Sequence, residues 1–121
     1  MSKNKPIHLG LIIARKGEYG TLAFDIDNHP LSKIKQEIRI LQEKEKMGNC
    51  IIAESSKDHY HAFFFWNQLK WEELCRIIDN FPLADKQFKA FKKTHDFLRM
   101  RLTNMPMKEL ITIKSKYHKN D

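Results

Sequence analysis

Two apolar runs of strand length lie close together in the middle of the sequence, and this feature constrains the fold more than any other. The runs are NCIIAESS (49–56) and YHAFFFW (60–66), around the short polar segment SKDH. Apolar runs of about four to eight residues beside a turn signal are typical of buried strands. So short a connection suits neighbouring antiparallel strands. We therefore expect the two runs to form a strand pair within one sheet.

The segments before this pair predict two more strands. HLGLIIAR (8–15) and TLAFDID (21–27) are strand-like, and the turn-forming residues KGEYG separate them. Gly17 and Gly20 in this turn can adopt positive φ, as tight hairpin turns require. We therefore expect the first two strands to form a hairpin.

The predicted helices come from apolar residues at steps of three and four. The first begins at Pro30, which suits the first turn of a helix, and Gly48 supplies its stop. A second helix is expected from a cap at Asn67 to about Asp79. The basic segment ADKQFKAFKKTH (84–95) predicts a third helix.

Two further strands, FLRMRLTN (97–104) and ELITIKS (109–115), complete the predicted order. The middle of this order, βαββα(α)β, is that of an RRM-like or ferredoxin-like fold. We therefore expect an α+β class: an antiparallel sheet with helices packed on one face, an extra N-terminal hairpin strand and an extra C-terminal strand. The length of 121 residues suits one domain, 1–121. Because such a sheet serves many functions, the function must be inferred from the side chains on its open face.

The positive charge is concentrated in the last third of the chain. Residues 1–85 carry 12 Lys and Arg against 12 Asp and Glu, whereas residues 86–121 carry 10 against 3, so the last segment accounts for the net charge of +7. An excess confined to one segment favours a polyanionic partner such as nucleic acid. A solvated basic tail is the alternative.

Other features of the composition indicate an intracellular protein. The longest apolar run is too short to span a membrane, and the start MSKNKPIH lacks the apolar core of a secretory signal. Cys50 and Cys75 form no CxxC pair, so we interpret them as reduced thiols. We expect a cytoplasmic location and no membrane partner.

Two carboxylates are predicted on one face of the strand TLAFDID. Asp25 and Asp27 are two residues apart, so they share a face, while Phe24 and Ile26 point to the other. Adjacent carboxylates on a half-buried strand repel each other unless a cation neutralises them. Hard oxygen ligands suit Mg²⁺ or Mn²⁺. The alternative is that Asp27 only begins the next loop or caps a helix.

The polar residues around SKDH form a second candidate group. A histidine beside Ser55, Ser56 and Lys57 has the chemistry of a phosphate-binding loop, with hydroxyls and cations presented together. His59 and His61 share a strand face, so a metal held by both imidazoles is a second reading. A polar turn with no ligand is the third.

Two other sets of side chains alternate along strands. Arg99 and Arg101 share a face and suit bidentate phosphate contacts, although charge that protects an edge strand is an equal alternative. Phe63 and Phe65 share the face of the histidines. We interpret these two rings as core residues rather than as base-stacking residues.

These motifs resemble the archaeo-eukaryotic primase and primase–polymerase superfamily over about residues 21–104. FDID is similar to the DxD motif of that family, and SSKDHYHAFFF is similar to its second motif, with Ser55, Ser56, Tyr60 and His61 in register. A helix lies between the two motifs, as in the family. The resemblance implies a metal-dependent nucleotidyltransferase of DNA replication, either a DNA primase or a primer-extending polymerase.

The resemblance also implies a role for each matching residue. Asp25, Asp27 and Asp85 would hold Mg²⁺ or Mn²⁺ in a two-metal scheme. The nucleotide triphosphate would be bound by Ser55, Ser56, Lys57, His61, Arg99 and Arg101. Template backbone would be contacted by Lys86, Lys89, Lys92 and Lys93. The implied partners are a single-stranded DNA template and nucleoside triphosphates, with a helicase or another replication protein as a further partner.

Two other functions stay open at this point. HYHAFFF also looks like the histidine–hydrophobe–histidine motif of rolling-circle replication initiators, which use a tyrosine nucleophile. Residues 67–116 contain no tyrosine, and Tyr117 arrives only near the terminus. The other alternative is a non-catalytic basic nucleic-acid-binding module, for which the carboxylates would be incidental.

Overall fold

Strands and helices follow one another in the expected order. The computed structural model describes residues 8–103 and 108–119. In these ranges the elements are β1 (His8–Arg15), β2 (Tyr19–Asp27), α1 (Leu31–Glu45), β3 (Cys50–Ser56), β4 (His59–Lys70), α2 (Trp71–Asn80), α3 (Lys86–Thr94), β5 (Phe97–Thr103) and β6 (Lys108–Ile113).

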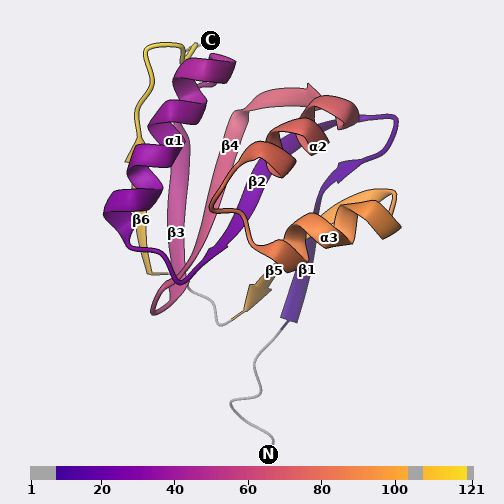
Figure 1. Ribbon diagram of the computed structural model, residues 1–121, viewed down its shortest axis with the longest axis horizontal. Coiled ribbons are helices and arrows are strands. Elements are labelled where there is room, and N and C mark those ends of the chain that lie inside the picture. Colours follow the sequence, from indigo (N-terminus) through magenta and orange to yellow (C-terminus); the bar gives the residue numbers. More distant parts are fainter. Residues whose placement is uncertain (1–7, 104–107, 120–121) are drawn as a thin grey trace, which may run out of the picture.

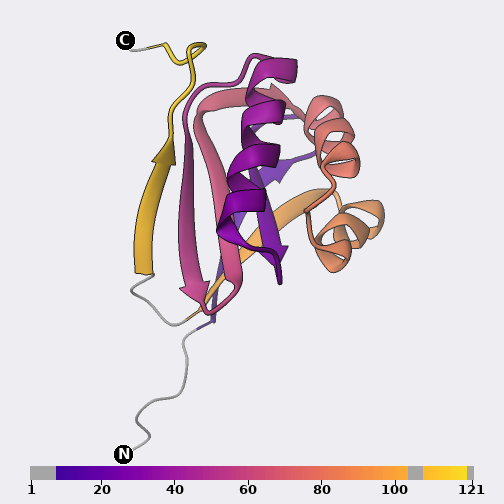
Figure 2. The same ribbon diagram turned by 60° about the vertical axis from the view of Figure 1, so that its left-hand side comes forward.

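An antiparallel sheet with helices on one side forms the body of the protein. Within the described residues the strands pair in the order β2-β4-β3-β6, and β1 pairs with β5 in a separate two-stranded sheet. Helices α1 and α2 lie on the same side of the larger sheet (Figures 1 and 2). The α+β class is confirmed, and the four-stranded sheet is compatible with a ferredoxin-like fold.

The predicted pairing of the N-terminal hairpin is wrong. The chain does turn between the strands, with Gly17 at φ 87° and the Glu18 N–H donating to the Arg15 carbonyl at 3.0 Å. However, the first residues of β2 pair with the end of β4, and β1 pairs with β5. Gly20 lies so close to β1 that a Cβ would stand 2.5 Å from the Cβ of Ala14. Gly20 therefore provides space for this contact rather than a positive φ.

Two predicted helix ends are also wrong. Strand β4 continues to Lys70, because its second half pairs with the start of β2, so Asn67 lies in a strand and caps no helix. The Asn67 side chain instead accepts a hydrogen bond of 2.8 Å from the Gly48 N–H. Helix α1 ends at Glu45, and Lys46 rather than Gly48 adopts the left-handed conformation.

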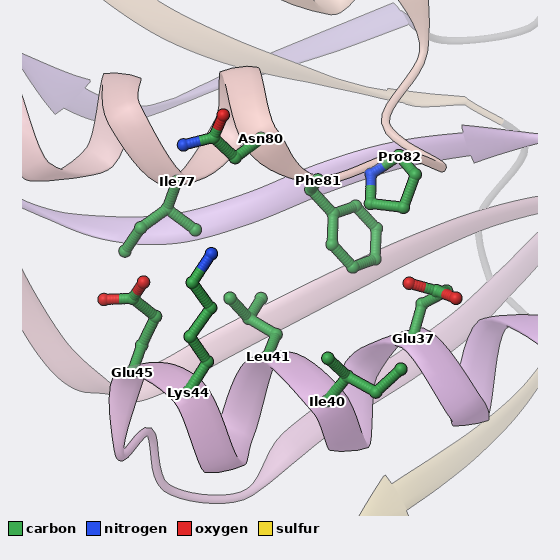
Figure 3. A pocket seen from close by; sticks show the side chains of 9 residues that line it. All are labelled: Glu37, Ile40, Leu41, Lys44, Glu45, Ile77, Asn80, Phe81 and Pro82. Carbon is green, nitrogen blue, oxygen red and sulfur yellow. The ribbon is translucent and has the colours of Figure 1, made fainter.

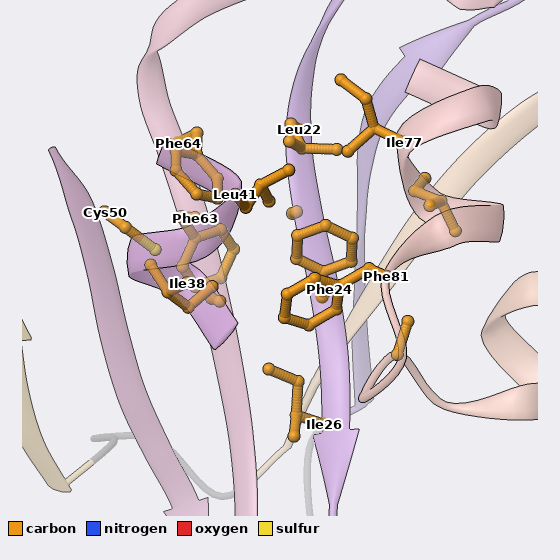
Figure 4. Close-up of a cluster of buried hydrophobic side chains, with 14 of the residues drawn as sticks. Leu22, Phe24, Ile26, Ile38, Leu41, Cys50, Phe63, Phe64, Ile77 and Phe81 are labelled. Carbon is orange, nitrogen blue, oxygen red and sulfur yellow. The ribbon is translucent and has the colours of Figure 1, made fainter. Parts of the chain in front are cut away.

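The core between the sheet and the helices fixes which side chains of β2 face outward. Leu22, Phe24 and Ile26 are fully buried on the helix side, where the Phe24 ring stacks on Phe81 with centroids 4.3 Å apart (Figure 4). Because side chains alternate along a strand, Asp25 and Asp27 lie on the opposite, open face. The predicted separation of the apolar and acidic residues of β2 is confirmed.

Candidate functional site

Two aspartate–histidine pairs connect β2 and β4 on the open face. Asp25 lies opposite His61 in the strand ladder, and Asp27 lies opposite His59. In each pair a carboxylate Oδ1 is 2.8 Å from an imidazole Nδ1. Directly opposed residues of antiparallel strands have their side chains close together, so the ladder itself brings these groups into contact.

The two pairs differ in their exposure to solvent. The His61 side chain is 8% exposed and that of Asp25 is 30% exposed, whereas His59 and Asp27 are 47% and 36% exposed. The Nδ1 of His61 also lies 3.0 Å from the Sδ of Met100 on β5. The Asp25–His61 pair is therefore held in place by the packing around His61, while the Asp27–His59 pair is more exposed to solvent.

A hollow beside the two aspartate–histidine pairs is lined by polar residues of both predicted motifs. Its lining residues in the described part of the chain are Asp25, Asp27, Ser55, Ser56, His59, Tyr60 and His61. A bulge between Glu54 and Ser56 shifts the end of β3 against β4, and the Ser55 hydroxyl donates to the His59 carbonyl at 3.3 Å. The sequence therefore predicted most of the residues that line this hollow.

Other predicted site residues lie elsewhere. Lys57 is exposed in the β3–β4 turn and is not among the lining residues. Asp85 uses its side chain to cap α3, accepting hydrogen bonds from two backbone N–H groups at 3.0 and 3.2 Å. Its own N–H donates to the Asp25 carbonyl at 2.8 Å, so Asp85 supports Asp25 through the backbone. The Arg99 guanidinium lies over the Phe91 ring on α3, 5.8 Å from its centroid. The Arg101 side chain falls outside the described residues.

Half of the lysines predicted to contact template are used within the fold. The Lys92 Nζ lies 2.6 Å from Asp79 Oδ1, and the Lys92 side chain is only 5% exposed. The Lys89 Nζ donates to the Asp79 carbonyl at 3.4 Å. These two lysines connect α3 to α2, which leaves Lys86 and Lys93 as the exposed pair.

The aromatic residues beyond His61 form a row with it along one face of β4. His61 stacks on Phe63 with centroids 6.2 Å apart, and Phe63 stacks on Phe65 at 4.9 Å. Phe63 is buried, as interpreted, whereas Phe65 is 47% exposed, so the interpretation of Phe65 as a core residue is wrong. The contact from Met100 was not predicted, although its alternation with the two arginines of β5 places it on the other face of that strand.

The hollow offers a cation two carboxylates. Among the described residues no group of three or more His, Cys, Asp or Glu side chains is arranged to hold a metal ion. A divalent cation here would complete its coordination with water and with oxygen atoms of a substrate, which is how Mg²⁺ is commonly held. The donor set therefore suits a metal that binds together with a phosphate-bearing substrate.

A different hollow lies between α1 and α2 (Figure 3). Leu41, Ile77 and Phe81 line it on the inside, and Glu45 at its edge pairs with Arg76 outside the lining through two contacts of 3.0 Å. Among its described lining residues there is no serine, histidine or pair of aspartates. Its chemistry is therefore less suited to phosphate or metal than that of the hollow around Asp25 and Asp27.

Comparison with known proteins gave no match, whether with family models, with curated proteins or with solved structures. In the part of the chain that the structure describes, no helix combines the length and the apolar character needed to cross a membrane.

Proposed function

We propose that the chain is a metal-dependent nucleotidyltransferase that adds nucleotides on a single-stranded DNA template, as a DNA primase or a primer-extending polymerase. One observation carries the proposal: Asp25 and Asp27 share a hollow with Ser55, Ser56 and the two histidines. Two carboxylates for a cation and hydroxyls for phosphate oxygens are the groups that phosphoryl transfer requires. The resemblance to the primase–polymerase superfamily supplies the substrate class.

Each residue of the hollow has a task in this reaction. Mg²⁺ or Mn²⁺, when bound, supplies the positive charge that activates the attacking hydroxyl and stabilises the leaving pyrophosphate. Asp25 and Asp27 would hold the cation, with Asp25 kept in place by His61 and with the contact between Asp27 and His59 exchanged for the metal. Ser55 and Ser56 donate hydrogen bonds to the phosphate oxygens. His59 would then be a further donor to the same phosphates.

The supporting residues differ from those that the resemblance implies. Asp85 positions Asp25 through the backbone and is not needed as a third ligand. Lys57, in the β3–β4 turn, does not line the hollow and would add positive charge to the triphosphate from outside it. Arg99 faces α3 and has no part in the proposed site.

The experiment is a denaturing-gel assay with single-stranded DNA, with and without a primer, and labelled nucleoside triphosphates in Mg²⁺ or Mn²⁺. We expect labelled products from the wild type, and none from Asp25→Asn or Asp27→Asn. Asp58→Asn is the matched control, because Asp58 lies in the β3–β4 turn at φ 64° and does not line the hollow. Asparagine tolerates that backbone conformation. Equal product from all four proteins would refute the proposal.

The same gel separates this proposal from DNA nicking. Tyr117 lines a hollow with Gly48 and Trp66. Trp66 is seven residues along β4 from His59, a length of at most about 23 Å at 3.3 Å per residue. That distance leaves the tyrosine far from the two histidines. Cleaved template with a covalent protein adduct, lost in Tyr117→Phe and kept in Asp25→Asn, would show that the protein is a nickase.

A further inference from the structure

A second polar hollow lies at the other end of the sheet, and we call it the C-terminal hollow. It is lined by Lys46, Gly48, Trp66, Asn67, Tyr117, His118 and Lys119. The chain after β6 reaches the end of α1 there, whereas the β3–β4 turn of the Asp25 site is at the opposite end of the sheet (Figures 1 and 2). The two hollows are therefore separate sites joined by β3 and β4.

The wall that the C-terminal segment contributes is held by specific hydrogen bonds. The Ser115 hydroxyl donates to the Met47 carbonyl at 2.7 Å, and the Ser115 N–H donates to Asn49 Oδ1 at 2.9 Å. The Asn49 N–H in turn donates to Nδ1 of His118 at 3.1 Å. A Cβ on Gly48 would stand 2.9 Å from that same nitrogen. Specific hydrogen bonds thus fix this wall of the hollow, and the absence of a side chain at Gly48 provides the space for the His118 ring.

The lining combines aromatic rings with positive charge. Trp66 is 50% exposed and meets the His118 ring edge-to-face with centroids 4.8 Å apart. Lys46 and Lys119 are exposed at the rim, and no aspartate or glutamate is among the described lining residues. Aromatic faces that stack bases, beside lysines that neutralise phosphates, are the usual means of binding single-stranded nucleic acid.

We propose that the C-terminal hollow binds the single-stranded DNA template, with a base stacked on Trp66 and the backbone phosphates beside Lys46 and Lys119. The choice of single-stranded DNA as the ligand rests on the proposed function. The inference also gives a use to the basic residues after β6, which the Asp25 site does not employ.

The test is fluorescence anisotropy of a labelled 12-residue oligodeoxythymidylate in buffer with EDTA, so that no metal contributes. Phe65→Ala is the matched control for Trp66→Ala, because the two rings are adjacent on β4 and are 47% and 50% exposed, but Phe65 stacks on Phe63 whereas Trp66 contacts His118. We expect Trp66→Ala to weaken binding about 5- to 100-fold, as for loss of one stacked base. Phe65→Ala should stay within about twofold of the wild type.

The lysines are tested through the salt dependence of the same binding constant. The variants are Lys46→Asn and Lys119→Ala, and asparagine suits the left-handed conformation of residue 46. Each variant should reduce the magnitude of the slope of log K against log salt by about 0.7, because each neutralises one phosphate fewer. Lys16→Ala, in the exposed β1–β2 turn, should leave the slope unchanged. Equal slopes for all four proteins would overturn the assignment of the phosphate contacts.

A second measurement does not require Trp66 to be removed. In Trp71→Phe, Trp66 is the remaining tryptophan, so stacking of a thymine should quench the emission on titration with the oligonucleotide. An unchanged emission at saturation, or wild-type affinity in a folded Trp66→Ala protein, would refute the inference. Asp27→Asn should still bind the oligonucleotide. If it binds while the wild type extends no primer, the proposed reaction fails and the single-strand site stands.

Discussion

The two aspartate–histidine pairs predict very different effects on stability for the same substitution. His61→Ala removes a buried ring that contacts Asp25 and Met100. Replacing a large buried side chain with alanine typically costs about 2–5 kcal/mol, and Asp25, being 30% exposed, recovers part of its hydration. We therefore expect a loss of about 2–4 kcal/mol. His59→Ala breaks an exposed pair and should cost about 0–1 kcal/mol.

Urea denaturation and thermal unfolding at pH 7, both followed by circular dichroism, measure the two losses. For a chain of this length about 1 kcal/mol corresponds to about 4 °C in Tm, so His61→Ala should melt about 8–16 °C below the wild type and His59→Ala at most about 4 °C below it. Asp25→Asn keeps a side-chain oxygen that can accept a hydrogen bond from His61, and its loss should stay within about 1 kcal/mol. Equal losses for the two histidine variants would refute the claim that one pair is structural and the other open to a cation.

Three other predictions follow from particular contacts. The hydrogen bond from Arg76 lowers the pKa of Glu45, so this pair stabilises the fold fully above the usual pKa of glutamate and loses its effect as pH falls through the lowered pKa of the folded state. Arg76→Ala should therefore lower the urea midpoint at pH 7, and this difference should shrink as the pH falls through that lowered pKa. Gly48→Ala brings a methyl group against His118 and should cost about 1–3 kcal/mol in the same denaturation assay. Burial raises the pKa of the Cys50 thiol, so this cysteine should react with Ellman's reagent only after denaturation.

The open-face residues of β2 could be predicted because strand alternation is a local rule. Because side chains alternate along a strand, Asp25 and Asp27 lie on the face that Phe24 does not share, regardless of tertiary contacts. The histidines that contact these carboxylates were harder to predict from the sequence. The register that sets Asp25 against His61 depends on a break in the ladder, where Thr21 pairs with Gln68 and Leu22 with Phe64, so the extra residues lie in β4.

Contacts between distant elements account for most of the wrong predictions. The pairing of β1 with β5 joins segments about 90 residues apart, and no local pattern distinguishes it from a hairpin. That pairing also decides which face of β5 meets the site, and it places Met100 beside His61 and Arg99 beside α3. Asp85 precedes a helix as well as matching a motif, and the local capping interaction takes its side chain.

The most direct test of the central claim is a titration of Mn²⁺ into the protein, followed by the paramagnetic signal of the free ion. With a nucleoside triphosphate analogue present, the wild type should remove Mn²⁺ from solution well beyond the amount that the analogue binds alone. Asp25→Asn and Asp27→Asn should abolish the excess, and Asp58→Asn should retain it. Excess binding that survives in both aspartate variants, or no excess in the wild type, would contradict a catalytic metal site at Asp25 and Asp27.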